Sequence, residues 1–269
     1  MKKALTVAGS DSSGGAGLQA DLKTFQELGV YGMSAVTTIV AMDPYNSWFH
    51  NVFPVDVDTV KAQLDTIVVG AGVDAMKTGM LGSPAIIELT AKYIDDHGIE
   101  KVVIDPVMVC KGADEELHPE NTESLREYLI PRALVTTPNL FEAAKLAKMP
   151  PITTIEQMKE AASVIHELGA KYVLVKGGNK IQHDKAVDVL YDGKTFEILE
   201  GERIDTTYTH GAGCTSSAAI TAELAKGADV KDAIRTAKAF ITEAIKNGWK
   251  LNQYVGPVDH GAYRRRANA

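Results

Sequence analysis

The sequence predicts a three-layer α/β fold in which helices cover both faces of a mostly parallel β-sheet. Short apolar runs alternate with stretches of helical spacing along most of the chain, the pattern of βαβ units. Near residue 190 the pattern changes, because two short runs at 186–191 and 195–199 flank Asp192-Gly193, a strong hairpin signal. No repeat or low-complexity linker interrupts the series. We therefore predict one domain over residues 1–269, with a late β-hairpin.

The individual elements follow from local pattern and from the residues that end them. Leu18, Leu22 and Phe25 recur at helical spacing, and Gly29 supplies a stop. Apolar, often β-branched runs predict strands at 4–8, 35–41, 73–77, 101–105, 133–137 and 171–176. Amphipathic spacing predicts helices at about 18–28, 57–67, 84–97 and 158–168, followed by a mostly helical, Ala-rich last third.

Composition excludes several classes of protein. The 269 residues are 45% hydrophobic and 23% charged, as in a globular domain. A net charge of -7 argues against a nucleic-acid surface. No apolar run approaches the roughly 18 residues that span a bilayer, so we expect no membrane partner. The two cysteines suit a reducing compartment, and we expect the protein to be cytoplasmic.

The segment Thr209–Ser217 places small residues at the start of a predicted helix. The first amides of a helix have no intrahelical partner, and the terminus carries about half a positive charge. Such a terminus suits a phosphate or a developing oxyanion, and glycine lets the backbone approach it. We expect the same terminus to lower the pKa of the Cys214 thiol. A small-residue helix start made only for close packing is the alternative, and these residues alone do not decide between the two.

Further candidates follow the strands, because ligands of open α/β sheets bind beyond the carboxyl ends of the strands. The residues there are nearly all small, polar or glycine: Gly9–Asp11, Met42–Asp43, Thr78–Met80, Asp105–Pro106, Asn139 and Gly177–Gly178. Val107 is a further candidate substrate contact.

A second glycine-rich stretch, Gly15–Ala20, fits the G-x-G-x-x-A form of a dinucleotide-binding fingerprint. The glycines do not open directly from the first strand, since residues 9–13 intervene, and Asp43 lies farther on than the usual ~20 residues. A nicotinamide oxidoreductase is therefore a disfavoured alternative. Walker A, zinc and serine-hydrolase motifs do not occur in the sequence.

Taken together, six motifs resemble the hydroxymethylpyrimidine (phosphate) kinases and their pyridoxal-kinase relatives in the ribokinase superfamily. They occur in the family's order and cover essentially the whole chain. The motifs are Ala8–Lys23, Lys77–Leu81, Asp105–Val109, Thr137–Ala143, Val175–Gly178 and Thr209–Thr215. The resemblance implies a ribokinase-like fold and transfer of the ATP γ-phosphoryl group to a hydroxymethyl group on a small aromatic ring.

At the phosphoryl-transfer end, the resemblance assigns the catalytic base to Cys214, where the superfamily motif carries aspartate. A thiolate could accept the hydroxyl proton if the helix terminus keeps the thiol partly ionised. The amides of Gly211, Ala212 and Gly213 would stabilise charge on the transferring group.

At the nucleotide end, the resemblance implies that ATP contacts Asn139, Glu142, Lys176, Asp188 and Gly213. Mg²⁺ prefers oxygen ligands, so Glu142 and Asp105 are the metal candidates. Each has a structural alternative. Asp105 and Asn139 could cap turns next to proline, Lys176 could form a strand-end salt bridge, and Glu142 could be a first-turn helix charge.

Two departures from the pyrimidine kinases bear on the substrate. Met42 stands where those enzymes usually carry glutamine, and it offers an apolar contact in place of hydrogen bonds. Cys110 stands where they have a small residue, so we hypothesise that its thiol adds reversibly to the aldehyde of pyridoxal; a small buried hydrophobe is the alternative. Residues 111–118 form a candidate lid, and His210 is a further candidate substrate contact.

These arguments favour ATP-dependent phosphorylation of the 5′-hydroxymethyl group of pyridoxal, and of pyridoxine and pyridoxamine. A hydroxymethylpyrimidine (phosphate) kinase of thiamine synthesis and a non-catalytic pyridoxal-binding protein remain alternatives. The resemblance also implies a homodimer, although no stripe of residues identifies its interface.

Overall fold

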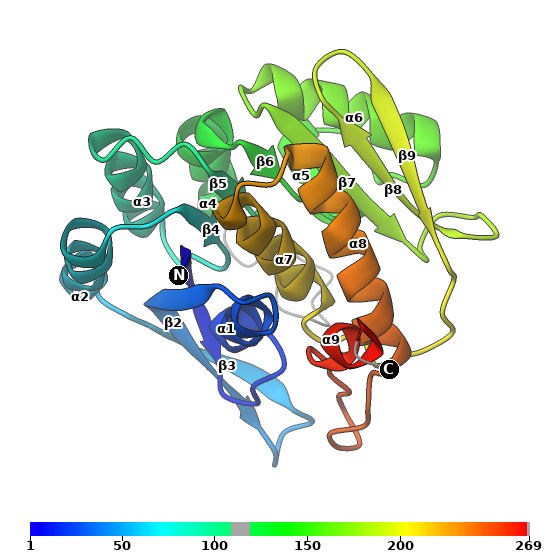
Figure 1. Ribbon diagram of the computed structural model, residues 1–269, viewed down its shortest axis with the longest axis horizontal. Helices are drawn as coiled ribbons and strands as arrows, with labels where there is room; N and C mark the ends of the chain where they lie inside the picture. Colours follow the sequence, from blue (N-terminus) through cyan, green and yellow to red (C-terminus); the bar gives the residue numbers. More distant parts are fainter. Residues whose placement is uncertain (109–118, 268–269) are drawn as a thin grey trace.

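In the computed structural model, residues 1–108 and 119–267 are described, and their strands form one sheet (Figure 1). The strand order is β3-β2-β1-β4-β5-β6-β7-β8-β9. The parallel strands are β1 (Lys3–Asp11), β2 (Tyr31–Asp43), β4 (Ala75–Thr78), β5 (Val102–Ile104), β6 (Val135–Thr136) and β7 (Tyr172–Gly178). The antiparallel strands are β3 (Phe49–Pro54) at one edge and β8 (Ala186–Tyr191) and β9 (Phe196–Gly201) at the other. The predicted mostly parallel sheet with a late hairpin is confirmed.

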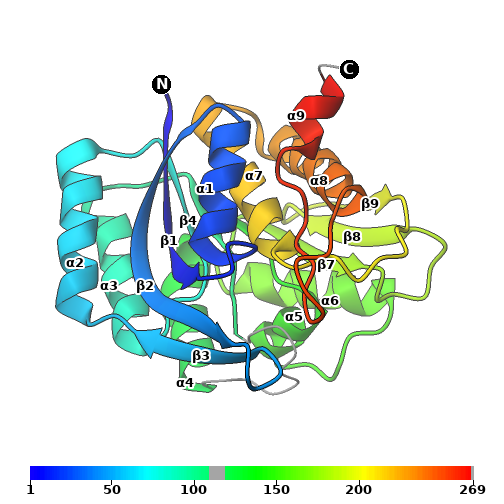
Figure 2. The ribbon, with the colours of Figure 1, turned by 90° about the horizontal axis from the view of Figure 1, so that it is seen from below.

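Helices cover both faces of this sheet, as predicted (Figures 1 and 2). One face carries α1 (Gly17–Glu27), α7 (Ala212–Lys226) and α8 (Val230–Lys246), with the short α9 (Ala262–Ala267) against α8. The other face carries α2 (Val57–Leu64), α3 (Pro84–Asp96), α4 (Pro119–Ser124), α5 (Leu140–Ala147) and α6 (Ile155–Glu167). Short π-helical segments extend α2 and α4, at Asp65–Ala71 and Leu125–Leu129.

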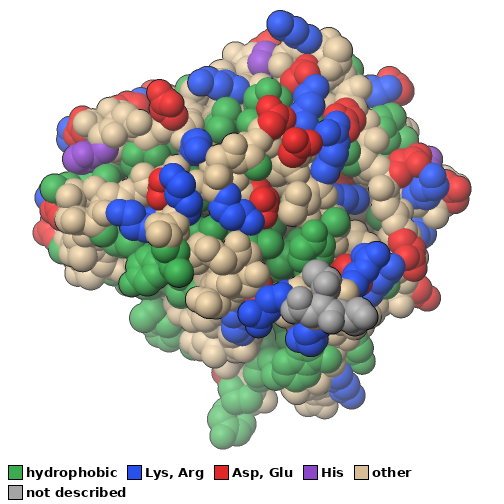
Figure 3. Space-filling view, in the orientation of Figure 1, with side chains coloured by type: hydrophobic (Ala, Val, Ile, Leu, Met, Phe, Trp, Pro, Cys, Tyr) green, Lys and Arg blue, Asp and Glu red, His purple; other side chains and the backbone are tan. Residues whose placement is uncertain are grey.

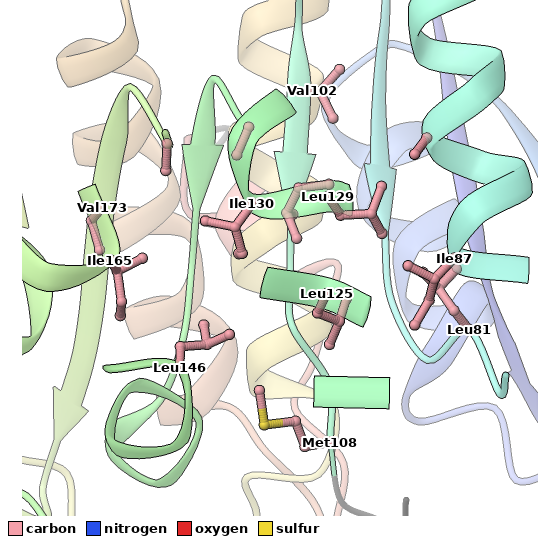
Figure 4. Close-up of a cluster of buried hydrophobic side chains, with 14 of the residues drawn as sticks. Leu81, Ile87, Val102, Met108, Leu125, Leu129, Ile130, Leu146, Ile165 and Val173 are labelled. Carbon is pink, nitrogen blue, oxygen red and sulfur yellow. The ribbon is translucent and has the colours of Figure 1, made fainter. Parts of the chain in front are cut away.

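Each face has its own hydrophobic core. On the α2–α6 face, Leu129, Leu146 and Ile165 are buried with strand residues such as Val102 and Val173 (Figure 4). On the other face, Phe25 of α1 and Phe240 of α8 are buried in one cluster with the alanines of α7. Alanine and serine on α7 let this helix lie close to its neighbours and to the sheet, which is why α7 is buried along most of its length.

Helix starts agree with the sequence where a cap signal is present. Ser83 accepts a hydrogen bond from the N–H of Ile86 (3.4 Å), and Pro84 is the first residue of α3, as predicted. Thr154 and Gln157 form a capping box at α6, so this helix begins three residues before the predicted Met158.

Three elements were not predicted: β3, α4 and α5. The edge strand β3, Phe49-His50-Asn51-Val52-Phe53-Pro54, ends in proline and does not alternate apolar with polar residues. The helix α5 follows β6 closely, and only its first turn was considered, through Glu142 as a possible first-turn helix charge. Strand β6 itself is only two residues long, shorter than the predicted 133–137.

The parallel strands all end at one edge of the sheet, and α7 begins at that edge beside α1 (Figure 2). The candidate residues of the six motifs therefore converge in space, except for those at 109–118, which lie outside the described residues. Among the described helices, none combines the length and the apolar character that crossing a membrane requires.

Candidate active site

Two glycine-rich segments meet backbone to backbone at the start of α7. Gly211, the N-cap of α7, has a φ of +81°, and a Cβ placed on it would lie 1.8 Å from the carbonyl oxygen of Gly15. Gly17, the first residue of α1, has a φ of +56°, and its Cβ would lie 2.4 Å from the carbonyl oxygen of Gly9. A side chain at Gly211 would push the two segments apart, and one at Gly17 would push α1 away from the end of β1. The dinucleotide-like glycines therefore serve close packing against the second glycine segment.

The start of α7 places a backbone amide without a helical partner beside a cation. Gly213 is its second residue, so the Gly213 N–H has no partner within the helix. The Lys176 ammonium lies 3.5 Å from where a Cβ on Gly213 would be, which adds a cation to the helix terminus. The N–H of Ala212 already donates to the carbonyl of Thr209 (3.1 Å). Of the three predicted amides, that of Ala212 is thus occupied by the turn itself.

Cys214 is half-buried at this terminus, and the nearby backbone N–H of Gly17 lowers the pKa of its thiol. Burial raises the pKa of the Cys214 thiol to about 12, and Lys77 opposes this while Asp21 and Asp105 add to it. The expected lowering of this pKa was wrong, because desolvation and two carboxylates outweigh the helix terminus and Lys77. A pKa this high favours the protonated thiol at neutral pH.

Asp11 and His210 clasp the two glycine segments together. Asp11 accepts hydrogen bonds from the N–H of Ser13 and of Ala16 (both 2.8 Å), and it pairs with Nε2 of His210 at 2.7 Å. Burial alone would raise the pKa of Asp11, but the bonds from His210 and Ser13 lower it to about 2. Asp11 and His210, both predicted to contact the substrate, are buried and bonded to each other. This pair holds the two glycine-rich segments in position.

The C-terminal segment completes this clasp. The N–H of His210 donates to the carbonyl of Gly256 (3.1 Å), and the N–H of Val258 donates to the carbonyl of His210 (3.2 Å). His260 then contacts the hydroxyl of Thr215 at 3.1 Å, and burial lowers the pKa of His260 to about 4. Neutral His260 thus packs behind the start of α7.

A fully buried ion pair lies beneath the site. Lys77 of β4 donates to Asp21 of α1 at 2.7 Å, both side chains have no exposed surface, and the Thr6 hydroxyl donates to the other Asp21 oxygen at 2.6 Å. Burial would lower the pKa of Lys77, but Asp21, Cys214 and Asp105 raise it, so the ammonium stays charged. Sequence reasoning did not single out this pair. The signal was a lysine inside the apolar run Ala75–Thr78, since a buried lysine requires a partner.

Asp105, after β5, is bonded on both carboxylate oxygens. It accepts from Lys176 (3.2 Å) and Thr137 (3.1 Å) on one oxygen and from Ser217 (3.1 Å) on the other. Burial alone would raise the pKa of Asp105, but Lys176 and Lys77 outweigh it and hold that pKa below its usual value. The strand-end salt bridge considered for Lys176 is present, and it ties β5, β7 and α7 together.

Asn139 and Glu142 form a capping box at α5. The N–H of Glu142 donates to Asn139 (3.0 Å), and the N–H of Asn139 donates to Glu142 Oε2 (2.8 Å). Burial raises the pKa of Glu142 to about 7, with Lys176 opposing the rise. The structural alternatives for both residues are therefore realised, and their contacts with nucleotide and metal stay predictions.

Asp188 on β8 accepts hydrogen bonds from the N–H of Gly178 (3.2 Å) and from the Lys238 ammonium of α8. Asp188 also lies beside Lys176, because the two residues are paired in register between β7 and β8. Lys238 was not singled out in the sequence, and its distance of 50 residues from Asp188 left no local signal.

The remaining candidates lie at the other half of the edge. A Cβ on Gly9 would lie 2.5 Å from the Thr38 hydroxyl and 3.7 Å from Met80 Cβ. Met42 is half-buried on β2, beside His50 of β3 in the register of the sheet. Val107 is half-buried after β5, and the predicted Cys110 and the candidate lid at 111–118 lie outside the described residues.

No cluster of three or more His, Cys, Asp or Glu side chains suited to a metal ion occurs in residues 1–108 and 119–267. Asp105 already accepts three hydrogen bonds over its two oxygens, which leaves little capacity for a metal. Glu142 uses one oxygen in its cap, which leaves the other as the better candidate. A single carboxylate together with phosphate oxygens and water is a usual Mg²⁺ site in phosphate-handling enzymes.

Comparison with known proteins gives a consistent result. The family described as phosphomethylpyrimidine kinase matches residues 11–259. A pyridoxine kinase of Bacillus subtilis is 66% identical over 264 residues, which are 98% of this chain and 97% of that protein. The crystal structure of an ADP complex of Bacillus subtilis pyridoxal kinase superimposes with a TM-score of 0.96 at 66% identity, over 98% of this chain and 99% of that one. Pyridoxal kinase from Staphylococcus aureus in complex with AMP-PCP and pyridoxal superimposes with a TM-score of 0.93 at 50% identity, over 98% and 95% of the two chains.

Proposed function

We propose, on the premise that this chain belongs to the phosphomethylpyrimidine kinase family and is a kinase, that it transfers the γ-phosphoryl group of ATP to the 5′-hydroxymethyl group of pyridoxal. The observation that carries the proposal is the 66% identity, over nearly the full length of both chains, with a protein named pyridoxine kinase. Pyridoxine and pyridoxamine carry the same hydroxymethyl group, so we include them as substrates.

The acceptor half of the site supports a vitamin B6 ring. Met42 offers an apolar contact where a pyrimidine would need a hydrogen-bonding side chain, and Met80 and Val107 lie at neighbouring strand ends. Gly9 leaves room beside them, since a side chain there would meet the Thr38 hydroxyl.

The transferring phosphoryl group would lie against the start of α7. The Gly213 amide and the Lys176 ammonium would stabilise its charge, because phosphoryl transfer depends mainly on positioning and electrostatics. Cys214 would accept the hydroxyl proton as the substrate oxygen bonds to the γ-phosphorus and the bond from that phosphorus to ADP breaks. As a base it must first lose its own proton to water, so the charges around its sulfur control the step.

The nucleotide would extend over Asn139, Glu142, Lys176 and Asp188. Glu142, through the oxygen that its cap does not use, would hold Mg²⁺ together with phosphate oxygens and water, and the metal would supply positive charge to the ATP phosphates. Lys176 would then exchange part of its contact with Asp105 for phosphate.

For Cys110 we propose a reversible hemithioacetal with pyridoxal. The thiol sulfur would bond to the aldehyde carbon, the carbonyl π bond would become a C–O single bond, and the thiol proton would end on that oxygen. Pyridoxine has no aldehyde, so Cys110→Ala should change the pyridoxal difference spectrum and turnover while leaving pyridoxine turnover intact. An unchanged pyridoxal spectrum in this variant would exclude the adduct.

The deciding experiment is ADP release with ATP and Mg²⁺, comparing pyridoxal with hydroxymethylpyrimidine in wild type and Cys214→Ala. Turnover of pyridoxal that collapses in Cys214→Ala supports the proposal. Preference for hydroxymethylpyrimidine would support the second candidate, a kinase of thiamine synthesis, which the name of the matching family favours. Pyridoxal binding without ADP would indicate a binding protein.

We also propose a homodimer in which a second copy of this chain covers the edge strand β3. Phe49 and Phe53 on β3 and Tyr45 in the preceding turn are exposed. Figure 3 shows hydrophobic side chains at the bottom of the molecule, where β3 lies in Figure 1. An exposed apolar edge strand is an aggregation hazard unless something covers it. Light scattering should report a dimer that Phe49→Ser with Phe53→Ser converts to monomer, whereas Phe196→Ser on the opposite edge should not.

A further inference from the structure

The Lys77–Asp21 pair is a costly feature that the proposed reaction, as described so far, does not use. Removing two charges from water costs several kcal/mol per ion, and apolar residues of similar size often serve stability as well or better. Both side chains are fully buried, and the pair joins the central strand β4 to α1. A buried ion pair beneath the site therefore needs an explanation other than stability.

The position of the pair relative to Cys214 follows from the elements around it. The start of α1 lies beside Cys214, because the backbone N–H of Gly17 lowers the pKa of its thiol and α1 packs against α7. Asp21 is four residues after Gly17 on α1, so both lie on one side of the helix, about one turn apart. Lys77 then donates to Asp21 at 2.7 Å. In the sheet, Lys77 is level with Thr6, and β4 packs against α7, which carries Cys214 (Figure 2).

The charges that face the sulfur come from four elements. Asp21 lies on α1, Lys77 on β4, Asp105 after β5 and Lys176 on β7, and each interacts electrostatically with Cys214. Asp105 and Lys176 pair with each other, and Lys176 also lies under Gly213, where we place phosphate. Lys77 is therefore the cation that stays with the acceptor side during the reaction. An ammonium has three donors, and Asp21 takes one of them.

We propose that Lys77 is a positioning residue of the phosphoryl-transfer step: held by Asp21 and Thr6, its ammonium is the fixed countercharge for the thiolate form of Cys214 when that sulfur takes the proton of the substrate hydroxyl. This inference rests on the proposed function. It explains why a thiol can replace the aspartate of related kinases at this position, since a carboxylate ionises without such help.

The test separates the charge of Lys77 from its role in packing. Removing Lys77 alone would strand Asp21 as a buried charge and endanger folding. The informative pair is Asp21→Asn, in which Lys77 loses its direct partner and Asp105 is the remaining carboxylate that raises its pKa, and Lys77→Met with Asp21→Asn, which removes both charges with little change in shape. Lys92→Met with Asp96→Asn makes the same substitutions in an exposed pair and is the matched control.

The first readout is the pH dependence of Cys214 alkylation by iodoacetamide, followed on the Cys214 peptide by mass spectrometry so that Cys110 does not interfere. Asp21→Asn should move the profile to lower pH than wild type, and the double variant should move it to higher pH than Asp21→Asn, by about one unit or more. Coincident profiles for these two variants overturn the proposal. If the double variant does not fold, Asp21→Asn against wild type decides, and a profile that does not move down overturns it.

The second readout is turnover. At pH 7.5 the double variant should lose about tenfold or more in kcat, and its pH–rate profile should shift upward, with KM for ATP changing less than about threefold. The control pair should match wild type. Alkylation needs no substrate, so a wild type that does not phosphorylate pyridoxal refutes the proposed function while the alkylation comparison still decides the role of Lys77.

Discussion

The two halves of the candidate site are held together by different interactions. The glycine half, around Gly9, Gly15, Gly17 and Gly211, brings backbone against backbone with no room for a Cβ. The charged half, around Asp105, Glu142, Lys176 and Asp188, holds its shape through ion pairs and caps between elements. The glycine half is therefore sensitive to added volume, whereas the charged half is sensitive to an unbalanced charge.

The sharpest test of the glycine half is Gly211→Ala. A Cβ 1.8 Å from the Gly15 carbonyl must displace one of the two segments, and the positive φ adds strain. We expect kcat to fall by about 100-fold or more, because small displacements of reacting groups have effects of this size. ADP release and circular dichroism measure activity and folding.

Gly227→Ala is the matched control for that substitution. Gly227 ends α7 with a φ of +99°, and nothing lies within 4 Å of a Cβ placed there. It should lose about 1–2 kcal/mol of stability and little activity. Equal loss of activity in both variants would mean that strain, and not the contact with Gly15, controls the site.

The next effect belongs to the charged half. Lys176→Met leaves Asp105 buried without its nearest cation, and we expect a loss of about 3–5 kcal/mol in the free energy of unfolding. Lys176→Met with Asp105→Asn should recover most of this loss in urea unfolding while remaining inactive. A double variant no more stable than the single one would refute the charge-balance account of this half.

Glu142→Gln should stabilise the protein in a pH-dependent manner. Because burial raises the pKa of Glu142 to about 7 from 4.5, ionising it in the folded state costs stability as the pH rises between these values. The variant should gain about 3 kcal/mol at pH 8 and less than about 1 kcal/mol at pH 5, since glutamine stays neutral and preserves the cap. Thermal unfolding at both pH values checks the sign, and a gain at pH 5 as large as at pH 8 would contradict it.

Asp11→Asn should act with the opposite sign and the smallest size. The folded pKa of about 2 lies below the ordinary 3.8, so ionised Asp11 stabilises the fold above pH 4, and this contribution is lost as the pH falls toward 2. We expect a loss of about 2 kcal/mol at pH 7 that shrinks below pH 4. Asp96→Asn, in an exposed pair, should change stability by no more than about 0.5 kcal/mol at either pH.

How well the sequence predicts a feature of this molecule depends on how far apart in the chain the residues that determine the feature lie. Caps, hairpin residues and helical spacing act over a few residues, and they located most strands and helices, including the hairpin at Asp192-Gly193. The edge strand β3 lacked such signals, whereas α5 has one that the prediction did not use, the capping box of Asn139 and Glu142.

Within the site, the sequence located the residues but not their partners. Asp11 and His210 are 199 positions apart, and Asp21 and Lys77 are 56 apart, so nothing local indicates that they pair. The thiol of Cys214 was misjudged for the same reason. A helix terminus is readable locally, whereas the burial and the carboxylates that raise the pKa come from α1 and from Asp105 after β5.

The bonds between His210 and the segment at Gly256 and Val258 also bear on how the protein is made. Synthesis on the ribosome runs from the N-terminus, and domains generally fold as they emerge. Every candidate residue of the site is translated before Gly256. The backbone N–H and carbonyl of His210, however, have no partner until the segment at Gly256 and Val258 has left the exit tunnel. A nascent chain carrying all of these residues would thus still lack the bonds that hold His210 behind the start of α7, and we expect this part of the site to reach its final form only after Gly256 and Val258 have emerged.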